Sequence, residues 1–286
     1  MNKLEITNQY KKIMILVPHQ DDEILMSAGI IYTSKKEEID IKVAIVTNGD
    51  YACSDYSKGK TRLRETIIGT QCVGLSENEL IFLGYADTGM PEEESFLMKL
   101  YRESDENKIY KSSCSDKTYG LEEKSEFHME QCGIHASYTR KHLKEDLKTM
   151  IMSYEPDCIF TTCEYDWHGD HSALFFFTKE ILKELEEKEN YHPALYCGLI
   201  HSCAGDEMWP RREGNYFDCP KDFDKNGVLK WEERYSFSMP VELSVQKQKD
   251  NLKYQALLKY ETALEPNAVE FLMSFIKDEE IFWKIQ

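Results

Sequence analysis

The chain has 286 residues, of which 41% are hydrophobic and 12% aromatic, and its formal net charge is -17. This length and apolar content favour a single large domain with a sizeable core. The negative charge argues against nucleic acid or an anionic membrane as partner and favours a small neutral or cationic ligand. No apolar signal core opens the chain, and no apolar run reaches the ~18 residues of a membrane span. Nine cysteines without a C-x-x-C pair fit free thiols in a reducing cytoplasm.

Short apolar runs alternate with helical segments along most of the chain. Alternation of this kind predicts an α/β fold, a Rossmann-like three-layer sandwich around a mostly parallel sheet. The predicted strands cover residues 12–18, 39–50, 79–87, 156–166, 194–200 and 234–240. The predicted helices cover residues 22–38, 61–75, 138–154, 171–189 and 245–264.

Two stretches interrupt the alternation. Residues 91–135 are polar and charged, and we interpret them as an insertion that forms a lid over the rest of the domain. Residues 201–230 form a second, loop-rich insertion. Because no linker or internal repeat separates them, residues 1–286 are predicted to form one domain. The sequence leaves a homo-oligomer open.

The first chemical motif follows the first predicted strand. After the apolar run Ile13 to Val17 come Pro18, His19, Asp21, Asp22 and Glu23. Ligands of open α/β sheets bind beyond the carboxyl ends of the strands, which is where these side chains lie. Acids at a helix start can also serve only to cap the helix and stabilise its dipole, and for Glu23 that role is at least as well supported.

A second motif, "EYDWHGDH", follows the strand predicted at 156–166. It contains Asp166, His168, Asp170 and His171. Two histidines and an aspartate around an open position are typical of a catalytic zinc site. Consecutive turn residues point in different directions, so that Asp22 can bind a metal while Asp21 accepts a proton from the attacking water. Gly169 disfavours a helix interior at "HGDH". His168 is therefore expected in the loop, as proton donor, and His171 in the first helical turn, as ligand, with Asp170 orienting the ring of His168. Either motif alone would fit surface residues; their joint occurrence favours a site.

Together, "PHQDDE" and "HGDH" resemble the signatures of the PIG-L/LmbE-like family of zinc-dependent de-N-acetylases. The resemblance extends to "VTNGD", to Arg62 and Glu65 in an R-x-x-E segment, and to "FLGYAD" and "SYEPDCIFT". It implies a metal bound by His19, Asp22 and His171, with Asp21 as general base, His168 as second catalytic histidine and Asp170 as its support. It also implies that Arg62 and Asp87 contact the substrate.

The chain departs from the family pattern at two places. Gln20 stands where the family usually has proline, which is expected to loosen the turn. Near residue 260 the chain reads "YETA", whereas many members carry Ser-Gln after a His or Tyr, so that substrate contacts from this segment are not implied.

The resemblance implies metal-assisted amide hydrolysis. The predicted function is removal of an N-acyl group, acetyl in the first place, from an N-acetylglucosamine-type sugar or conjugate. Zinc is the predicted metal, and iron(II) would fit the same ligands. An amidase acting on a thiol conjugate of an amino sugar is a second hypothesis. A non-catalytic sugar- or metal-binding protein is a third, against which the presence of Asp21 argues.

Two further stretches carry open interpretations. "DFDKNGVLKWEE" matches a calcium-loop template through Asp222, Asp224, Asn226 and Glu233. No convincing helix precedes it, Lys230 occupies a position that helps bind the ion, and Asn-Gly is a strong turn signal, so we favour a turn and leave the calcium site open. Trp209, beside Pro210, would suit either a sugar-stacking rim or an ordinary surface loop.

Overall fold

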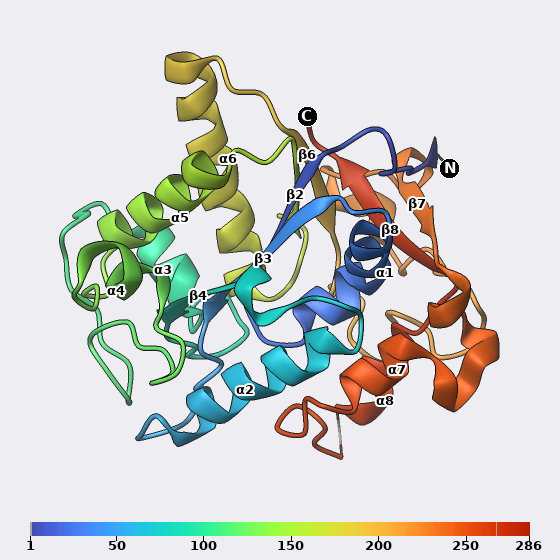
Figure 1. Ribbon diagram of the computed structural model, residues 1–286, viewed down its shortest axis with the longest axis horizontal. Coiled ribbons are helices and arrows are strands. Elements are labelled where there is room, and N and C mark those ends of the chain that lie inside the picture. The colour runs from blue at the N-terminus through green and yellow to red at the C-terminus, as the bar shows by residue number, and fades with distance from the viewer. Residues whose placement is uncertain (1, 267) are drawn as a thin grey trace.

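The structure, a computed structural model, describes residues 2–266 and 268–286, except for the side chains of Asp224 and Asn226. Within this part of the chain, eight strands form one sheet in the order β1-β7-β8-β6-β5-β2-β3-β4 (Figure 1). All neighbouring strands are parallel except β8, which runs antiparallel to β6 and β7. The strands are β1 (Asn2–Lys3), β2 (Lys12–Val17), β3 (Asp40–Thr47), β4 (Leu80–Tyr85), β5 (Cys158–Thr162), β6 (Ala194–Gly198), β7 (Tyr235–Ser238) and β8 (Glu279–Lys284).

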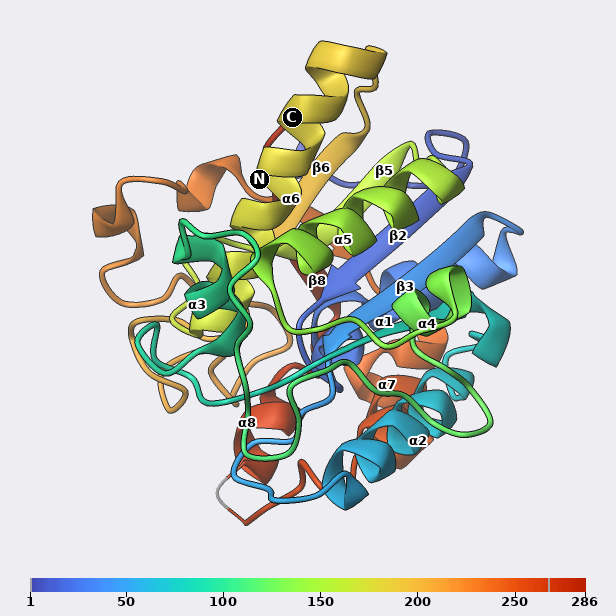
Figure 2. The ribbon, with the colours of Figure 1, turned by 90° about the vertical axis from the view of Figure 1, so that its left-hand side faces the viewer.

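Helices cover both faces of this sheet (Figure 2). The α-helices are α1 (Asp22–Lys36), α2 (Ser57–Gln71), α3 (Phe96–Arg102), α4 (Phe127–Cys132), α5 (Arg140–Tyr154), α6 (Gly169–Glu189), α7 (Leu252–Leu257) and α8 (Val269–Ser274). Apolar residues of α1, α2 and α7 pack into the core on one face, and those of α3 to α6 into the core on the other. The predicted three-layer α/β architecture is confirmed.

The apolar run of β2 shows how the sequence specifies these layers. Ile13, Ile15 and Val17 belong to the core shared with α1, while Met14 and Leu16 belong to the core shared with α5 and α6. A strand covered by helices on both faces must be apolar at every position, because successive side chains point to opposite sides.

The C-terminal region differs from the prediction. In place of one helix over 245–264 there is a 3-10 segment, Val245–Asp250, followed by the short helix α7. Gln248 has a φ of 51°, which interrupts the helical path, and the side chain of Asn251 accepts a hydrogen bond from the amide of Tyr254 to start α7. Strand β8, whose first two residues are buried glutamates, was not predicted.

The two predicted insertions are anchored to the domain. In 91–135, helix α3 packs against α6, with Phe96 and Leu97 fully buried. That this segment acts as a lid stays a prediction. In 201–230, Trp209 is only 1% exposed and packs against Phe217 and Trp231. The interpretation of Trp209 as a sugar-stacking rim is therefore wrong, because its ring is part of the core.

At the calcium-like loop, Asp222 pairs with Lys225 at 2.8 Å and Glu233 pairs with Lys230 at 3.1 Å. The side chains of Asp224 and Asn226 lie outside the described residues, so calcium binding stays a prediction.

All nine cysteines are free thiols. No helix in the described ranges has the length and apolar character needed to cross a lipid bilayer.

Candidate metal centre and active site

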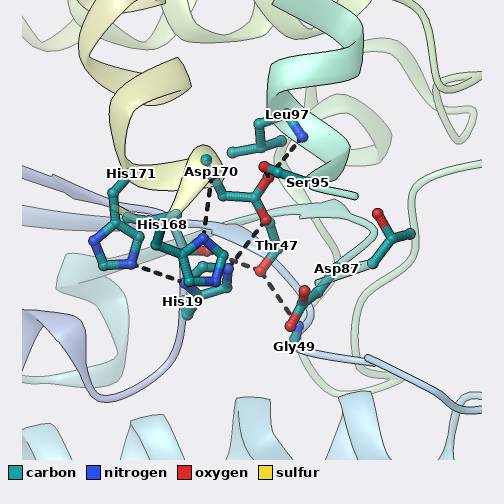
Figure 3. A network of polar contacts seen from close by, with 12 residues as sticks. His19, Thr47, Gly49, Asp87, Ser95, Leu97, His168, Asp170 and His171 are labelled. Carbon is teal, nitrogen blue, oxygen red and sulfur yellow. Dashed lines mark hydrogen bonds and ion pairs between the residues drawn. The ribbon is translucent and has the colours of Figure 1, made fainter. Parts of the chain in front are cut away.

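The two sequence motifs meet because their strands are neighbours. The chain passes from β2 to β3 and β4 and then returns to place β5 on the other side of β2. The order of the strands thus reverses beside β2, which is the switch point where open α/β sheets bind ligands. His19 follows β2, and His168 and His171 follow β5, so the crevice between the two strand ends receives both motifs (Figure 3).

Three side-chain atoms form a nearly equilateral triangle in this crevice. Nδ1 of His19 lies 3.2 Å from Nε2 of His171 and 3.4 Å from Oδ2 of Asp22. The Asp22 oxygen lies 3.3 Å from the same nitrogen of His171. Ligands at zinc–nitrogen distances of 2.0–2.1 Å in a tetrahedron are about 3.3 Å apart. The three atoms are therefore spaced as three corners of a tetrahedral site, with the fourth left open.

Each histidine of the triangle is oriented by a carboxylate at its other ring nitrogen. Nε2 of His19 lies 3.1 Å from Oδ2 of Asp170, and Nδ1 of His171 lies 3.1 Å from Oδ2 of Asp166. With these nitrogens protonated, the lone pairs of His19 Nδ1 and His171 Nε2 are directed at the shared point. Such carboxylate–histidine pairs fix ring orientation and tautomer at metal sites.

The position of Asp170 corrects one prediction. Its carboxylate binds His19, the amide of Leu97 at 2.7 Å and the hydroxyl of Ser95, not the ring of His168 (Figure 3). His168 is oriented by the backbone instead, because its Nδ1 accepts the amide of Asp170 at 3.2 Å. The carboxylate is drawn to His19 because that residue lies across the crevice, a contact between distant segments that spacing along the chain does not reveal.

His168 is the N-cap of α6 and His171 is in its first turn, as expected for their chain positions. Burial lowers the pKa of His168 well below its ordinary value, and the neighbouring His19, His171 and His201 rings lower it further. Since Nδ1 accepts an amide hydrogen, a neutral ring carries its proton on Nε2. His168 can therefore donate a hydrogen bond as neutral imidazole, and its expected role as a proton donor stays a prediction.

Two other groups of residues also bring donor atoms within 4.8 Å of one another: His19, His168 and His171, and His19, Asp87 and Asp170. In the first, ligation by Nε2 of His168 would need the ring proton on Nδ1, where a backbone amide already donates a hydrogen bond. In the second, a metal between His19 and Asp170 would replace the contact between Nε2 and Oδ2 at 3.1 Å. The triangle with Asp22 leaves all these contacts intact.

The charges around the triangle also fit a cation. Burial opposes charge on Asp22, but the adjacent His171 and His19 lower its pKa to about 2. Although burial works in the other direction, Asp170 and Asp22 raise the pKa of His19. A group of buried carboxylates that favours extra positive charge is the environment in which a divalent ion is stabilised.

Asp21 lies beside the triangle and does not belong to it. Its φ is 94°, a left-handed conformation that costs energy for a residue other than glycine. Its amide donates to Oε2 of Glu23 at 3.1 Å, and Oε1 of Glu23 accepts from the hydroxyl of Tyr260 at 2.5 Å. Glu23 therefore braces the turn that carries Asp21, in addition to lying in the first turn of α1.

The environment of Asp21 suits a general base. Burial raises the pKa of Asp21 to about 7. The negative charge of Asp22 raises this pKa further, whereas the positive charge of Arg62, 3.8 Å away, lowers it. A base whose pKa lies near neutrality combines a large ionised fraction with useful basicity.

This geometry agrees with comparisons to known proteins. The family model described as PIG-L, GlcNAc-PI de-N-acetylase, matches residues 14–182, which is more than half of the chain and includes both motifs. The chain belongs to the PIG-L family. A search of curated protein sequences returned no significant match.

Three solved structures share the PIG-L fold of this chain at low identity. One is N,N'-diacetylchitobiose deacetylase from Pyrococcus horikoshii, with a TM-score of 0.53 and 13% identity over 97% of this chain and 84% of that one. The A40926 pseudoaglycone deacetylase Dbv21 has a TM-score of 0.56 and 13% identity over 96% of both chains. GalB, a 4-carboxy-2-hydroxymuconate hydratase from Pseudomonas putida, has a TM-score of 0.52 and 11% identity over 96% of both chains. Because the fold also occurs in a hydratase, the fold alone does not indicate the function, and the residues of the site have to do so.

In this PIG-L family member, Gln20 makes two contacts that hold the turn after β2. The side-chain amide of Gln20 donates a hydrogen bond to the backbone carbonyl of Thr47 at 2.6 Å. The backbone carbonyl of Gln20 accepts a hydrogen bond from Nη2 of Arg62 at 2.9 Å. Gly49, at φ 60°, is required here, because a Cβ at this position would lie 2.3 Å from Oε1 of Gln20. The hydrogen bond to Thr47 ties Gln20 to the end of β3, and the expected loosening of the turn relative to proline stays a prediction.

Arg62 and Asp87 both line the cleft above the triangle. Arg62 contacts Asp21 and the carbonyl of Gly49, at 3.3 Å, and does not pair with Glu65, which instead binds the amide and hydroxyl of Thr262. Oδ1 of Asp87 accepts the amide of Gly89 at 3.2 Å. Burial raises the pKa of Asp87. Their predicted roles in substrate binding stay predictions.

The cleft has a volume of about 520 Å³. Most residues of its outer walls were not predicted to be functional. Trp167 is 48% exposed and lines the cleft. The position of Trp167 inside the second motif, "EYDWHGDH", is the signal that could have identified it as a residue of the site. Asp166, recognised in the motif without a role, orients His171. The C-terminal wall consists of Thr262, Ala263, Glu265, Ala268, Phe271 and Leu272. Thr262 and Ala263 belong to the "YETA" segment, at which the chain departs from the family pattern.

Proposed function

We propose that this protein is a metal-dependent hydrolase that removes an acyl group, acetyl in the first place, from the nitrogen of an N-acetylglucosamine-type sugar or conjugate. Zinc is the proposed metal, with iron(II) as a substitute that the same ligands accept. The observation that carries the proposal is the His19–Asp22–His171 triangle together with a separate buried carboxylate, Asp21, which lines the same cleft as His19 and Asp22. A site that only bound metal would have no use for that carboxylate.

The residues divide the work of amide hydrolysis among them. His19, Asp22 and His171 would hold the cation, which when bound supplies Lewis acidity that polarises an amide carbonyl and makes water more acidic. Asp21 takes the proton of the attacking water and returns it to the leaving amine. His168, through Nε2–H, donates a hydrogen bond to the oxygen on which negative charge develops. Arg62, 3.8 Å from Asp21, lowers the pKa of that carboxyl and so increases its ionised fraction at neutral pH.

Two alternatives remain within reach of the same experiment. The substrate could be a thiol conjugate of an amino sugar, because the open cleft does not fix the group attached to the sugar. A non-catalytic sugar- or metal-binding protein would need no base at position 21. The acidic residues of the cleft favour a neutral or cationic small molecule as substrate. The nine free cysteines support a reducing, cytoplasmic location for the protein.

The test measures amine and acetate released from N-acetylglucosamine derivatives by protein loaded with zinc or iron(II). Turnover is expected with metal and is expected to disappear with a chelator and to return when metal is restored. The Asp21→Asn variant is the matched comparison, because it keeps the size and shape of the side chain without its basicity. Amine release that does not depend on metal, or no release from any such substrate, would contradict the proposal.

A further inference from the structure

A fourth histidine, His201, faces the same cleft and takes no part in the chemistry above. It follows β6, lines the cleft, and its side chain is 14% exposed. Nδ1 of its ring lies 3.1 Å from Oδ1 of Asp206. The ring also stacks on Phe271 of the C-terminal wall, with centroids 4.9 Å apart and planes 16° apart. Its orientation is thus fixed from two sides.

The backbone of His201 is tied to the metal-binding loop. Its amide donates to Oδ2 of Asp166 at 3.1 Å, the oxygen that also orients His171. Its carbonyl accepts the amide of Trp167 at 2.8 Å. The His201 ring lies 5.3 Å from the His171 ring and 5.7 Å from the His168 ring, measured between centroids. A ligand bound at the triangle would therefore lie next to His201 and Trp167.

Asp206 occupies Nδ1 of His201, and Nε2 has no hydrogen bond to any residue that the structure describes. We propose that His201 is a specificity-determining residue whose Nε2 binds a hydroxyl group of the substrate, with Trp167 providing an aromatic face beside it. The inference rests on the proposed function and assigns one hydroxyl group of the sugar ring to this side of the cleft. A hydroxyl both donates and accepts, so it can pair with Nε2 in either protonation state of the ring.

The surrounding charges favour a hydroxyl over an anionic group. Asp206, Glu94 and Glu265 line this cleft together with the carboxylates of the first motif, against Lys58 and Arg62. A phosphate or carboxylate near His201 would be repelled by this excess of acids. An uncharged hydroxyl gains the hydrogen bond without that cost.

The test compares the binding of N-acetylglucosamine with that of its 3-, 4- and 6-deoxy analogues, by calorimetry on the zinc-loaded protein. Wild-type protein is expected to bind N-acetylglucosamine about ten-fold more tightly than one of the analogues. The His201→Phe variant keeps a ring on Phe271 but lacks both nitrogens. It is expected to lose that preference while zinc content and affinity for the same deoxy analogue stay unchanged. Asp206→Asn, which frees Nδ1, is expected to reduce the preference in part.

His192→Phe is the matched control, because His192 is an exposed histidine paired with Glu186 at 3.6 Å, away from the cleft. Wild-type protein that binds all four sugars equally, or none, would overturn the inference, and so would a His201→Phe variant that keeps the full preference. Amine release separates this inference from the proposed function. Discrimination by His201 without amine release would sink the hydrolase proposal alone, whereas amine release with unaltered discrimination in His201→Phe would sink this inference alone.

Discussion

The two walls of the cleft are built in different ways. The inner wall comes from the ends of the parallel strands β2 and β5 and lies within the part of the chain that matches the PIG-L family model. The outer wall comes from both sides of that limit: Trp167 lies within the match, whereas the loops and short helices around His201 and Phe271 lie beyond it. The proposed metal ligands thus lie where the most regular part of the fold ends, while His201, the proposed specificity residue, lies in the irregular part. Rigid strand ends hold ligands to within tenths of an ångström, whereas loops can vary without disturbing them.

The largest effect is expected on the inner wall. His171→Ala removes one corner of the triangle, so metal content should fall to background and turnover by about a thousand-fold or more. Metal analysis alongside amine release measures both. His192→Ala, at an exposed site, should change neither. Full zinc content in His171→Ala would mean that the ligands are misassigned.

Removal of the base should separate chemistry from metal binding. Asp21→Asn is expected to keep its metal and lose about 10²–10⁴-fold in turnover, the usual worth of a positioned base. Burial raises the pKa of Asp21 to about 7, and a bound cation would lower this pKa. Because only the ionised carboxylate accepts a proton, kcat/KM of the wild-type protein should fall as the pH drops through a value at or below about 7. This acidic limb should vanish in the variant. An unchanged pH profile would remove Asp21 from the mechanism.

The carboxylates behind the ligands should matter less than the ligands. Asp166→Asn leaves His171 in place but weakens the charge that orients it, and metal affinity should fall about 10- to 100-fold. Competition with a chelator gives the affinity. Asp157→Asn is the matched control, because Asp157 also accepts backbone amides but just before the opposite end of β5. Equal affinities in the two variants would contradict the role of Asp166.

Arg62 should tune the base without being required for metal binding. Arg62→Gln removes a positive charge that lowers the pKa of Asp21, so the acidic limb of the pH profile should move up by about one unit. Arg64→Gln, whose exposed guanidinium pairs with Glu123, should leave the profile unchanged. A shift to lower pH in Arg62→Gln would refute this account.

The smallest effect on activity is expected where the C-terminal segment meets the inner wall. Tyr260→Phe removes the hydrogen bond to Glu23, so the free energy of unfolding should fall by about 1–3 kcal/mol, while turnover changes only a few-fold. Urea unfolding measures the first quantity. Tyr216→Phe, at an exposed tyrosine, is the comparison. Unchanged stability in Tyr260→Phe would show that the contact contributes nothing to holding the two parts together.

Much of the inner wall could be predicted from the sequence because its signals are local. The runs of β2 and β5 are buried, and histidine and aspartate follow each of them within six residues. The partners of these residues could not be predicted. Asp170 binds His19 across 151 residues of chain, and Tyr260 binds Glu23 across 237, and no pattern in the sequence records such pairs. The C-terminal helix was misjudged because helical periodicity does not register a single residue, Gln248, with a positive φ.

The sequence by itself determined the layered α/β architecture and the two ends of strands that carry His19, Asp22 and His171, because strand, turn and helix signals act over a few residues. Only the tertiary structure decided which carboxylate orients which imidazole, that Trp209 is buried while Trp167 lines the cleft, and that His201 faces the site. These features depend on packing between segments far apart in the chain, and packing is settled by the whole core at once.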